Sequence, residues 1–136
     1  MEEPTFTIAD ISKNTGLSYD TIRYYEKIGL LPPAKRKDNG QREYDKRDLD
    51  RFIFITHLKR THMPLKEIER YMTMASDQKY SSCYSVLCEH KLRIESELAD
   101  MNATLEIMKY KMDHFQDMMK RSGLSADVTE EQVHHR

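Results

Sequence analysis

The chain has 136 residues, a formal net charge of −1 and two cysteines, Cys83 and Cys88. This length suits one small domain, or one small domain with an appendage. Two cysteines are too few for a disulfide framework, and the chain has no run of about 18 apolar residues that could cross a membrane. The acidic start MEEPTFTIAD lacks the basic and apolar regions of a signal peptide, so we expect a soluble cytoplasmic protein.

The small net charge hides an uneven distribution. Residues 1–75 contain 14 Lys and Arg against 12 Asp and Glu, whereas residues 76–136 contain 8 against 11. A total near zero excludes a general polycation, so any contact with nucleic acid must come from a local patch. The densest basic stretch is Lys35–Arg42, which has four basic residues and one acidic residue, Asp38.

Two short helices are expected at the start of the chain. Thr7 and Asp10 form a start that resembles a capping box, and Gly16 is the expected end of this first helix. Ser18 is the expected N-cap of the second helix, which should end at Gly29. Two short helices around a tight glycine turn are typical of a helix-turn-helix.

A hairpin and two further helices are expected next. The prolines of LLPP cannot continue a helix, and Asp38-Asn39-Gly40 strongly indicates a tight turn between two short strands. Asp45 should cap a third helix that runs to about Arg60, and Pro64 should lie near the start of a fourth. The third helix carries many of the expected core residues, namely Leu49, Phe52, Ile53, Ile55 and Leu58.

From Tyr84 onward the apolar residues follow a heptad repeat that is broken once, by Lys91. One heptad position carries Tyr84, Lys91, Leu98, Leu105, Met112 and Met119, and the other carries Leu87, Ile94, Met101, Met108 and Phe115. A stripe along a helix of roughly 40 residues needs a partner helix, because the small N-terminal domain cannot reach along it. A second copy of the chain is the simplest partner, so we expect a homodimer joined through this helix.

These elements predict a mainly α fold, a winged helix-turn-helix followed by a long coiled-coil helix. The expected divisions are a DNA-binding domain over residues 5–75, a joint over 76–82, a dimerisation helix over 83–122 and a flexible C-terminal tail over 123–136. No sequence signal in this arrangement calls for a cofactor, and none is expected.

The expected DNA-binding residues lie in the second helix and the wing. In a helix-turn-helix the start of the second helix reaches base edges in the major groove, where an arginine can bind guanine through two hydrogen bonds. The residues in that part of the helix are Ser18, Tyr19, Thr21, Arg23 and Tyr24, and the expected phosphate contacts of the wing are Lys35, Arg36, Lys37 and Arg42. Asp20 and Asp38 are expected to face protein or to cap the structure, because carboxylates near phosphate are unfavourable.

The segment from Phe6 to about Met74 resembles the MerR family of bacterial transcription regulators. The resemblance rests on the TIRYYEKIGLL end of the second helix, on the Arg42 and Tyr44 pair in the wing and on the long helix that follows. It implies a homodimer with an antiparallel coiled coil that binds a near-palindromic operator in a promoter with a long spacer. The activated dimer would then distort the DNA until RNA polymerase engages both promoter elements.

The resemblance also adds residues to the expected DNA contacts, namely Tyr44 in the wing and Lys59 and Arg60 at the end of the third helix. The chain departs from the family at His62-Met63-Pro64, where relatives usually have Gly-Leu-Ser or Gly-Met-Ser. The usual serine caps a helix, so we expect the fourth helix of this chain to start differently.

The signal to which the protein responds stays open at this point. Cys83 and Cys88 are about 140° apart round a helix, which excludes a tetrahedral metal site made by them alone and an unstrained disulfide between them. One hypothesis is a thiol sensor at Cys83 or Cys88, and another is a metal site that combines Cys83 and His90 with the partner's His114 or the partner's His135. A third is a small apolar ligand among Tyr71, Met72, Met74, Tyr80 and Tyr84, although these residues also suit an ordinary core.

Two other function classes compete with a DNA-binding regulator. An enzyme is not expected, because the sequence has no glycine-rich phosphate loop, no paired acid and base cluster and no metal-hydrolase spacing. A coiled-coil adaptor without sequence-specific DNA binding is the alternative, since the long helix alone would serve it. The basic wing beside Arg23 distinguishes the two classes, because an adaptor has no need of it.

Overall fold

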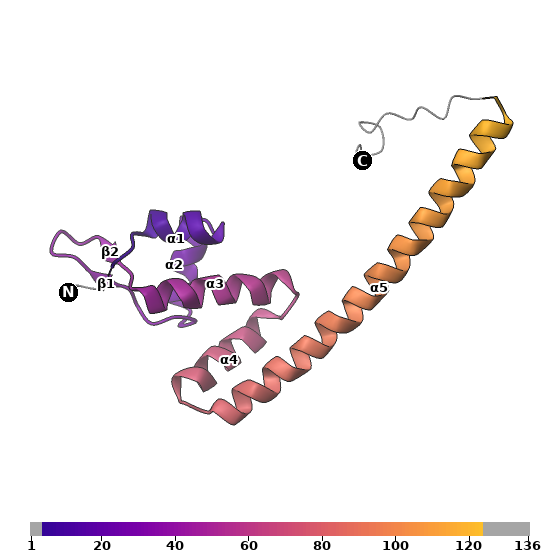
Figure 1. Ribbon diagram of the computed structural model, residues 1–136. Coiled ribbons are helices and arrows are strands. Elements are labelled where there is room, and N and C mark those ends of the chain that lie inside the picture. Colours follow the sequence, from indigo (N-terminus) through magenta and orange to yellow (C-terminus); the bar gives the residue numbers. More distant parts are fainter. Residues whose placement is uncertain (1–3, 124–136) are drawn as a thin grey trace. The chain divides into compact units, whose positions relative to one another are not determined.

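The computed structural model describes residues 4–123. It contains seven elements in this part of the chain: α1 (Ile8–Thr15), α2 (Tyr19–Lys27), β1 (Lys35–Arg36), β2 (Arg42–Glu43), α3 (Lys46–Arg60), α4 (Leu65–Ser76) and α5 (Tyr80–Arg121). The chain divides into two compact units, Met1–Lys91 and Leu92–Arg136. The prediction of a mainly α fold with a small wing and a long C-terminal helix is confirmed (Figure 1).

The first two helices begin at the predicted caps and α1 ends at the predicted glycine, whereas α2 ends at Lys27, two residues before Gly29. The Asp10 N–H donates to Thr7 Oγ1 over 3.1 Å, and the Thr7 N–H donates to Asp10 Oδ2 over 2.9 Å, which completes a capping box. Gly16 then ends α1 with a φ of 77°, a left-handed conformation that glycine adopts at little cost. Ser18 caps α2 through a hydrogen bond from the Thr21 N–H, so the turn between the two helices is short.

The wing is a two-stranded antiparallel sheet in which Lys35 pairs with Glu43 and Arg36 pairs with Arg42. Its turn contains Gly40, whose φ of 84° suits glycine. The base of the wing is joined to the start of the chain, because the N–H of Phe6 donates to the Tyr44 carbonyl over 2.7 Å and the N–H of Tyr44 donates back over 2.9 Å. This bridge holds the hairpin against the helical part of the first unit.

The core of the first unit is centred on α3, which packs against α1 and α4, while α1 also packs against α2 (Figure 1). The predicted α3 core residues Leu49, Phe52, Ile55 and Leu58 are buried, and Ile53 is partly buried. Phe52 also contacts the Tyr44 ring edge to face, with ring centroids 5.7 Å apart. One buried aromatic pair therefore fixes the base of the wing to the central helix.

The start of α3 is held by a second capping box. Asp45 Oδ1 accepts a hydrogen bond from the Asp48 N–H over 2.8 Å, and Asp48 Oδ2 accepts one from the Asp45 N–H over 3.1 Å. The backbone hydrogen bond from Asp48 holds the pKa of Asp45 below its ordinary value, whereas burial raises the pKa of Asp48. The predicted cap at Asp45 is confirmed.

The turn between α3 and α4 is where the chain departs from its resemblance to the MerR family, and the structure shows how. His62 has a φ of 68°, which is a left-handed conformation at the position where the resemblance leads us to expect glycine. Pro64 is the N-cap of α4 and provides no side-chain hydrogen bond. As expected, the fourth helix starts without a serine cap.

Replacing His62 by glycine should raise the free energy of unfolding by about 1 kcal/mol. A residue with a side chain costs about 1–2 kcal/mol in the left-handed region, and glycine removes this cost. The greater freedom of glycine in the unfolded chain offsets part of the stabilisation. Urea unfolding measures the change. His62→Ala is the matched control, since alanine keeps the unfavourable conformation and should leave stability nearly unchanged. Equal stability of the His62→Gly and His62→Ala variants would contradict the assignment.

Helix α5 begins at Tyr80, three residues before the predicted start of the dimerisation helix at Cys83. The Lys79 N–H still donates to the Met74 carbonyl at the end of α4, and Gln78 turns the chain with a φ of 59°. The joint is therefore shorter than the expected 76–82. His90 is buried in the first unit, where its Nε2 lies 2.7 Å from Thr61 Oγ1.

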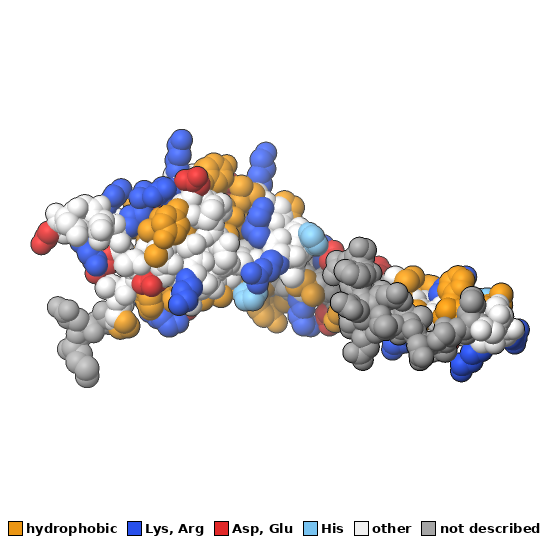
Figure 2. Space-filling view, turned by 90° about the horizontal axis from the view of Figure 1, so that it is seen from above, with side chains coloured by type: hydrophobic (Ala, Val, Ile, Leu, Met, Phe, Trp, Pro, Cys, Tyr) orange, Lys and Arg blue, Asp and Glu red, His pale blue; other side chains and the backbone are white. Residues whose placement is uncertain are grey.

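The second unit, as far as it is described, consists of the remaining part of α5. Many large apolar side chains of the heptad stripe are exposed there, including Leu98, Met101, Leu105, Met108, Met112 and Phe115. Figure 2 shows hydrophobic side chains on the surface of this helix where grey atoms do not cover it. No helix in the described part of the chain is both long enough and apolar enough to cross a membrane.

Candidate nucleic-acid interface

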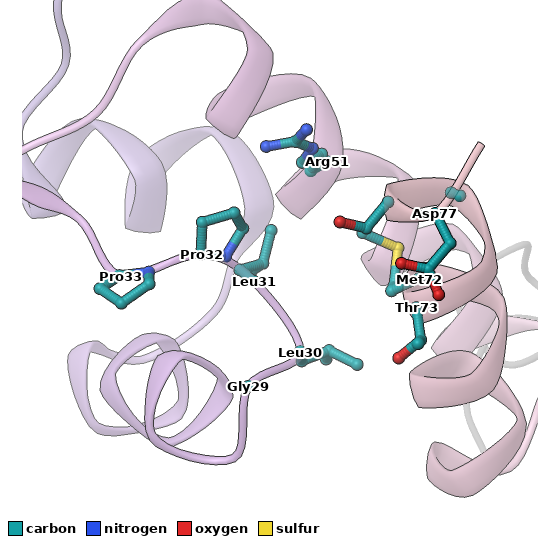
Figure 3. Close-up of a pocket in the computed structure, with 11 residues that line it drawn as sticks. Gly29, Leu30, Leu31, Pro32, Pro33, Arg51, Met72, Thr73 and Asp77 are labelled. Atoms are coloured by element: carbon teal, nitrogen blue, oxygen red, sulfur yellow. The ribbon is translucent and has the colours of Figure 1, made fainter.

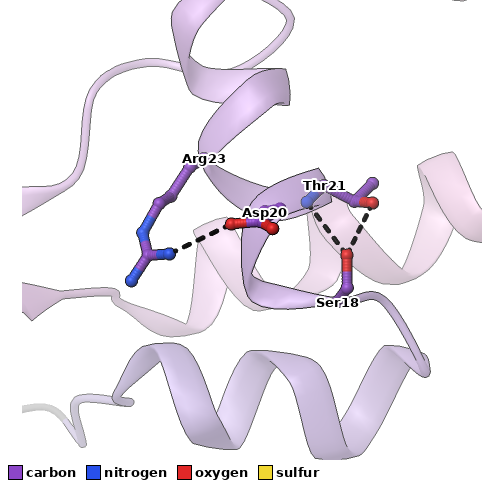
Figure 4. Close-up of polar contacts among 4 residues, drawn as sticks. All are labelled: Ser18, Asp20, Thr21 and Arg23. Atoms are coloured by element: carbon purple, nitrogen blue, oxygen red, sulfur yellow. Dashed lines mark hydrogen bonds and ion pairs between the residues drawn. The ribbon is translucent and has the colours of Figure 1, made fainter.

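The start of α2 is fixed by a small polar cluster (Figure 4). Ser18 Oγ accepts the Thr21 N–H over 3.1 Å and lies 2.8 Å from Thr21 Oγ1. Ser18 is exposed and Thr21 is partly buried. The Thr21 hydroxyl is therefore engaged within the helix start, and Ser18 presents its side chain at the surface.

Arg23 is exposed on the next turn of the same helix. Its Nη1 lies 3.3 Å from Asp20 Oδ1, and the two side chains are 48% and 96% exposed (Figure 4). Its guanidinium carbon also lies 5.9 Å from the centre of the Tyr19 ring. A pair this exposed contributes little to stability, so the guanidinium can exchange its partner for a ligand at small cost.

The expectation for Asp20 is wrong, because its side chain neither faces protein nor caps the helix. It is almost fully exposed and pairs with Arg23. The sequence did not reveal this pair, although the two residues are three apart on a helix and therefore adjacent on its surface. Asp20 lowers the positive charge around Arg23 until a partner displaces it.

The wing is tied to α2 by Glu26, a residue that the sequence reading did not single out. Glu26 Oε2 accepts a hydrogen bond from Arg42 Nε over 3.0 Å, and Glu26 Oε1 accepts one from the Tyr44 hydroxyl over 2.6 Å. The Glu26 side chain is 9% exposed and the Arg42 side chain is 24% exposed. The only sequence signal for Glu26 was its place in the RYYE stretch.

The structure gives Tyr44 a supporting position. Tyr44 is 2% exposed, and its hydroxyl is used by Glu26. Burial raises the pKa of this hydroxyl above its ordinary value, and the hydrogen bond to Glu26 adds to the shift, so Tyr44 stays neutral at physiological pH. Of the two predicted DNA contacts at the wing base, Arg42 is partly exposed, whereas Tyr44 is buried. Tyr44 supports Arg42 only through Glu26, to which both side chains donate a hydrogen bond.

Three of the predicted DNA-binding arginines meet around one hollow. It measures about 390 Å³ and is lined by Arg23 of α2, by Arg36 and Arg42 of the wing and by residues 7–9 at the start of α1. Arg36 is held there by a hydrogen bond from its Nη1 to the Gly40 carbonyl over 2.9 Å. The structure thus brings together residues from separate parts of the sequence into one basic surface.

The other predicted contacts lie around this surface or apart from it. Tyr24 is 49% exposed, and Lys35 and Lys37 are exposed on the wing. Lys59 and Arg60 are exposed at the end of α3, where Arg60 lines a separate hollow beside Asn14 and Thr15. In Figure 2, Lys and Arg side chains are spread over the visible face of the first unit.

The cysteines occupy different environments. Cys83 is buried, and its Sγ lies 4.0 Å from the Tyr71 carbonyl oxygen, whereas Cys88 is partly buried. Within residues 4–123 no group of three or more His, Cys, Asp or Glu side chains is placed to hold a metal ion. His135 lies outside the described residues. A set made with the partner's His114 therefore stays an untested hypothesis.

The expected apolar cleft is not assembled in the first unit. Its predicted members Tyr80 and Tyr84 are 69% and 72% exposed. A hollow of about 360 Å³ lies instead between the Gly29–Pro33 loop and α4, with Arg51 at its edge and Met72 as the one predicted member (Figure 3). A neighbouring hollow includes both Tyr71 and Met72.

Comparison with known proteins identifies the family to which this geometry belongs. Residues 6–75 match the family model described as MerR HTH family regulatory protein, and this range contains the helix-turn-helix, the wing, α3 and most of α4. The chain belongs to the MerR family.

Similar MerR regulators extend the match over the long helix. YyaN of Bacillus subtilis, an uncharacterised HTH-type transcriptional regulator, is 30% identical over 129 residues, which are 85% of this chain and 94% of YyaN. AdhR of the same organism, an HTH-type transcriptional regulator, is 34% identical over 89 residues, or 64% of each chain. HiNmlR, a MerR family regulator lacking the sensor domain, was solved bound to promoter DNA; it is 28% identical, with a TM-score of 0.78 over 93% of this chain and 98% of its own.

These relatives are described as transcriptional regulators. The predicted family and the class of DNA-binding transcription regulator are therefore confirmed. The structural match to HiNmlR spans both the helix-turn-helix and the long helix, because it covers nearly the full length of both chains.

Proposed function

We propose that this MerR regulator is a homodimer that binds a near-palindromic operator in a promoter with a long spacer. In response to a small effector or a stress signal, the dimer distorts the DNA so that RNA polymerase engages both promoter elements. One observation carries the proposal: the same chain presents an exposed basic surface around Arg23 and an exposed apolar heptad stripe on α5. The first surface suits DNA, and the second suits another copy of the chain.

The dimer is supported by the exposure of the heptad stripe. Leu98, Leu105 and Phe115 are 58%, 53% and 60% exposed in the single chain. Burial of one large apolar side chain contributes about 1.5–3 kcal/mol, and a symmetric pair of helices would bury each position twice. The family resemblance supports an antiparallel arrangement of the two helices.

DNA binding is supported by the placement of α2 and the wing. The start of α2 would lie in the major groove with Arg23 at a base edge, while the arginines of the wing bind the backbone. In a dimer the two surfaces would contact two half-sites of the operator, which explains why a palindrome is expected. Tyr19, Tyr24 and Ser18 are exposed on the same part of α2 and complete this surface.

The different burial of the two cysteines distinguishes them as candidate thiol sensors. An electrophile must reach the sulfur, and Cys83 is buried beneath the Tyr71 carbonyl, whereas Cys88 is partly exposed in the chain. Of the two candidate thiol sensors, we therefore propose Cys88 as the one that reagents reach first.

Sequencing the DNA that the purified protein selects from fragments of its own genome tests the proposed function. We expect an enriched palindrome that interrupts a long promoter spacer, together with a sedimentation coefficient of a dimer. A monomer that selects no DNA would refute the proposal. A dimer that selects no DNA would favour the coiled-coil adaptor.

Replacing Lys37 by alanine should weaken operator binding to a similar extent for every DNA sequence, because Lys37 is exposed on the wing and is proposed to bind a phosphate. The slope of log affinity against log salt concentration should fall by about 0.9 for each phosphate that the dimer no longer neutralises. Fluorescence anisotropy at several salt concentrations measures both effects. Lys109→Ala on α5 is the control and should change neither, whereas a sequence-selective loss in Lys37→Ala would contradict the phosphate-binding role.

A further inference from the structure

We infer that Glu26 is a positioning residue that orients Arg42 so that its outer N–H groups bind one backbone phosphate of the operator. The phosphate would enter the hollow between Arg42, Arg23, Arg36 and the start of α1. This inference rests on the proposed function, since it concerns how the same surface binds DNA. It assigns a role to a residue that does not itself contact the DNA.

The contacts of Glu26 show that the carboxylate is held from two sides. It lies near the end of α2, and its two oxygens accept separate hydrogen bonds from residues 16 and 18 positions further along the chain. Its side chain is 9% exposed, so a charge at this depth needs a paired cation. Arg42 supplies that cation, and Tyr44 supplies a neutral donor.

The way Arg42 meets Glu26 leaves the rest of its guanidinium available. A guanidinium has five N–H donors in a fixed plane, and Arg42 uses Nε for Glu26. Within residues 4–123 its Nη1 and Nη2 atoms make no hydrogen bond or ion pair. Pairing at Nε fixes the guanidinium plane and leaves the edge formed by Nη1 and Nη2 available, and this pair of nitrogens is a fork that can bind a phosphate.

The surroundings of Arg42 favour an anion of this kind. Arg23 and Arg36 line the same hollow, so three guanidinium groups face a space of about 390 Å³. In the described part of the chain, ion pairs join Arg42 to the buried Glu26 and Arg23 to the exposed Asp20. A phosphodiester entering the hollow can therefore pair with the outer N–H groups of Arg42 while Arg42 Nε keeps Glu26, and Arg23 stays available for a base edge.

The Glu26→Gln variant tests the inference with the selected operator. Glutamine has the same shape and can still accept the Tyr44 hydroxyl, but its amide group cannot hold Arg42 as a carboxylate does. We expect roughly 100-fold weaker binding, about tenfold for each copy in the dimer, which is the scale of losing one charge-assisted hydrogen bond, and we also expect a smaller salt slope. In an Arg42→Ala background the same change should have no further effect on affinity.

A second experiment replaces each operator phosphate in turn by a neutral methylphosphonate and measures the affinity. A purely structural role of Glu26 would leave the pattern of sensitive phosphates unchanged. For the wild type, methylphosphonate at one position of the operator should weaken binding strongly. For Glu26→Gln and for Arg42→Ala, methylphosphonate at the same position should have little effect. Tyr44→Phe is the matched control: it removes the other hydrogen bond to Glu26, so it should lower the melting temperature and retain the sensitive phosphate. Circular dichroism and sedimentation confirm that each variant is folded and dimeric.

Two results would overturn the inference without affecting the proposed function. One is a Glu26→Gln protein that binds the operator with the wild-type sensitivity at every phosphate. The other is loss of the sensitive phosphate in Tyr44→Phe as well as in Glu26→Gln, because this would make the effect one of general stability at the wing base. Failure of the wild type to select any DNA would refute the proposed function instead.

Discussion

Replacing Arg23 by alanine is expected to abolish operator binding and to leave the dimer intact. Arg23 is exposed near the start of α2, where it can bind guanine through two hydrogen bonds. Each such contact contributes about 1–3 kcal/mol of discrimination, and a symmetric dimer loses it twice, so the affinity should fall by roughly 30-fold to 20,000-fold. Fluorescence anisotropy with the selected operator measures the affinity, and sedimentation measures the dimer.

The control for this experiment is Asp20→Ala on the same helix. Asp20 pairs with Arg23 at the surface, so removing its carboxylate frees Arg23 and should leave operator binding unchanged or tighter. Neither variant should unfold the protein, because an ion pair this exposed contributes at most about 1 kcal/mol. Undiminished binding by Arg23→Ala would refute the docking of α2 in the major groove.

Replacing Leu105 by glutamate is expected to dissociate the dimer and thereby to remove operator binding. Leu105 lies on the heptad stripe and is 53% exposed in the single chain. In the proposed dimer its side chain would be buried, so the variant loses about 1.5–3 kcal/mol of apolar burial in each copy and places a carboxylate in an apolar interface. Sedimentation equilibrium measures the shift from dimer to monomer.

Ile107→Glu provides a closely matched control for Leu105→Glu. Ile107 is on the same helix and is 57% exposed, but it lies two residues further on and outside the heptad stripe. The same substitution there should leave the dimer and its DNA binding nearly unchanged. Equal dissociation by both variants, or by neither, would show that the heptad stripe is not the contact between the two copies.

The signals that predicted the fold correctly are local ones. The capping boxes at Thr7 and Asp45, the left-handed glycine at Gly16 and the Asn39-Gly40 turn each depend on residues within four positions of one another. Short-range hydrogen bonds and backbone preferences determine these features, so the sequence alone contains them. They were sufficient to place the helix-turn-helix and the wing.

The features that the sequence reading missed depend on contacts between distant residues. Glu26 joins Arg42 and Tyr44 across 16 and 18 positions, and His90 contacts Thr61 across 29. The buried place of Tyr44 also follows from these contacts, since a tyrosine has both an apolar ring and a polar hydroxyl and suits either a core or a surface. The folded chain shows that Tyr44 belongs to the core and not to the surface.

The start of α5 illustrates a smaller error with a physical cause. The sequence predicts the dimerisation helix over residues 83–122, directly after Ser81 and Ser82, and serine is a residue that favours helix starts. The helix begins at Tyr80, because α4 ends through the Lys79 N–H and Gln78 adopts the left-handed turn that redirects the chain. The helix boundary was set by the preceding turn and not by the serines.

Methionine accounts for much of the heptad stripe on α5, where Met101, Met108, Met112 and Met119 all occupy stripe positions. Peroxide converts a thioether into a polar sulfoxide, which is poorly suited to an apolar contact between helices. Oxidant treatment would thus weaken the association of two copies without reaction at either thiol. Loss of promoter occupancy after peroxide exposure should be compared with a variant that has leucine at these four positions before it is attributed to Cys83 or Cys88.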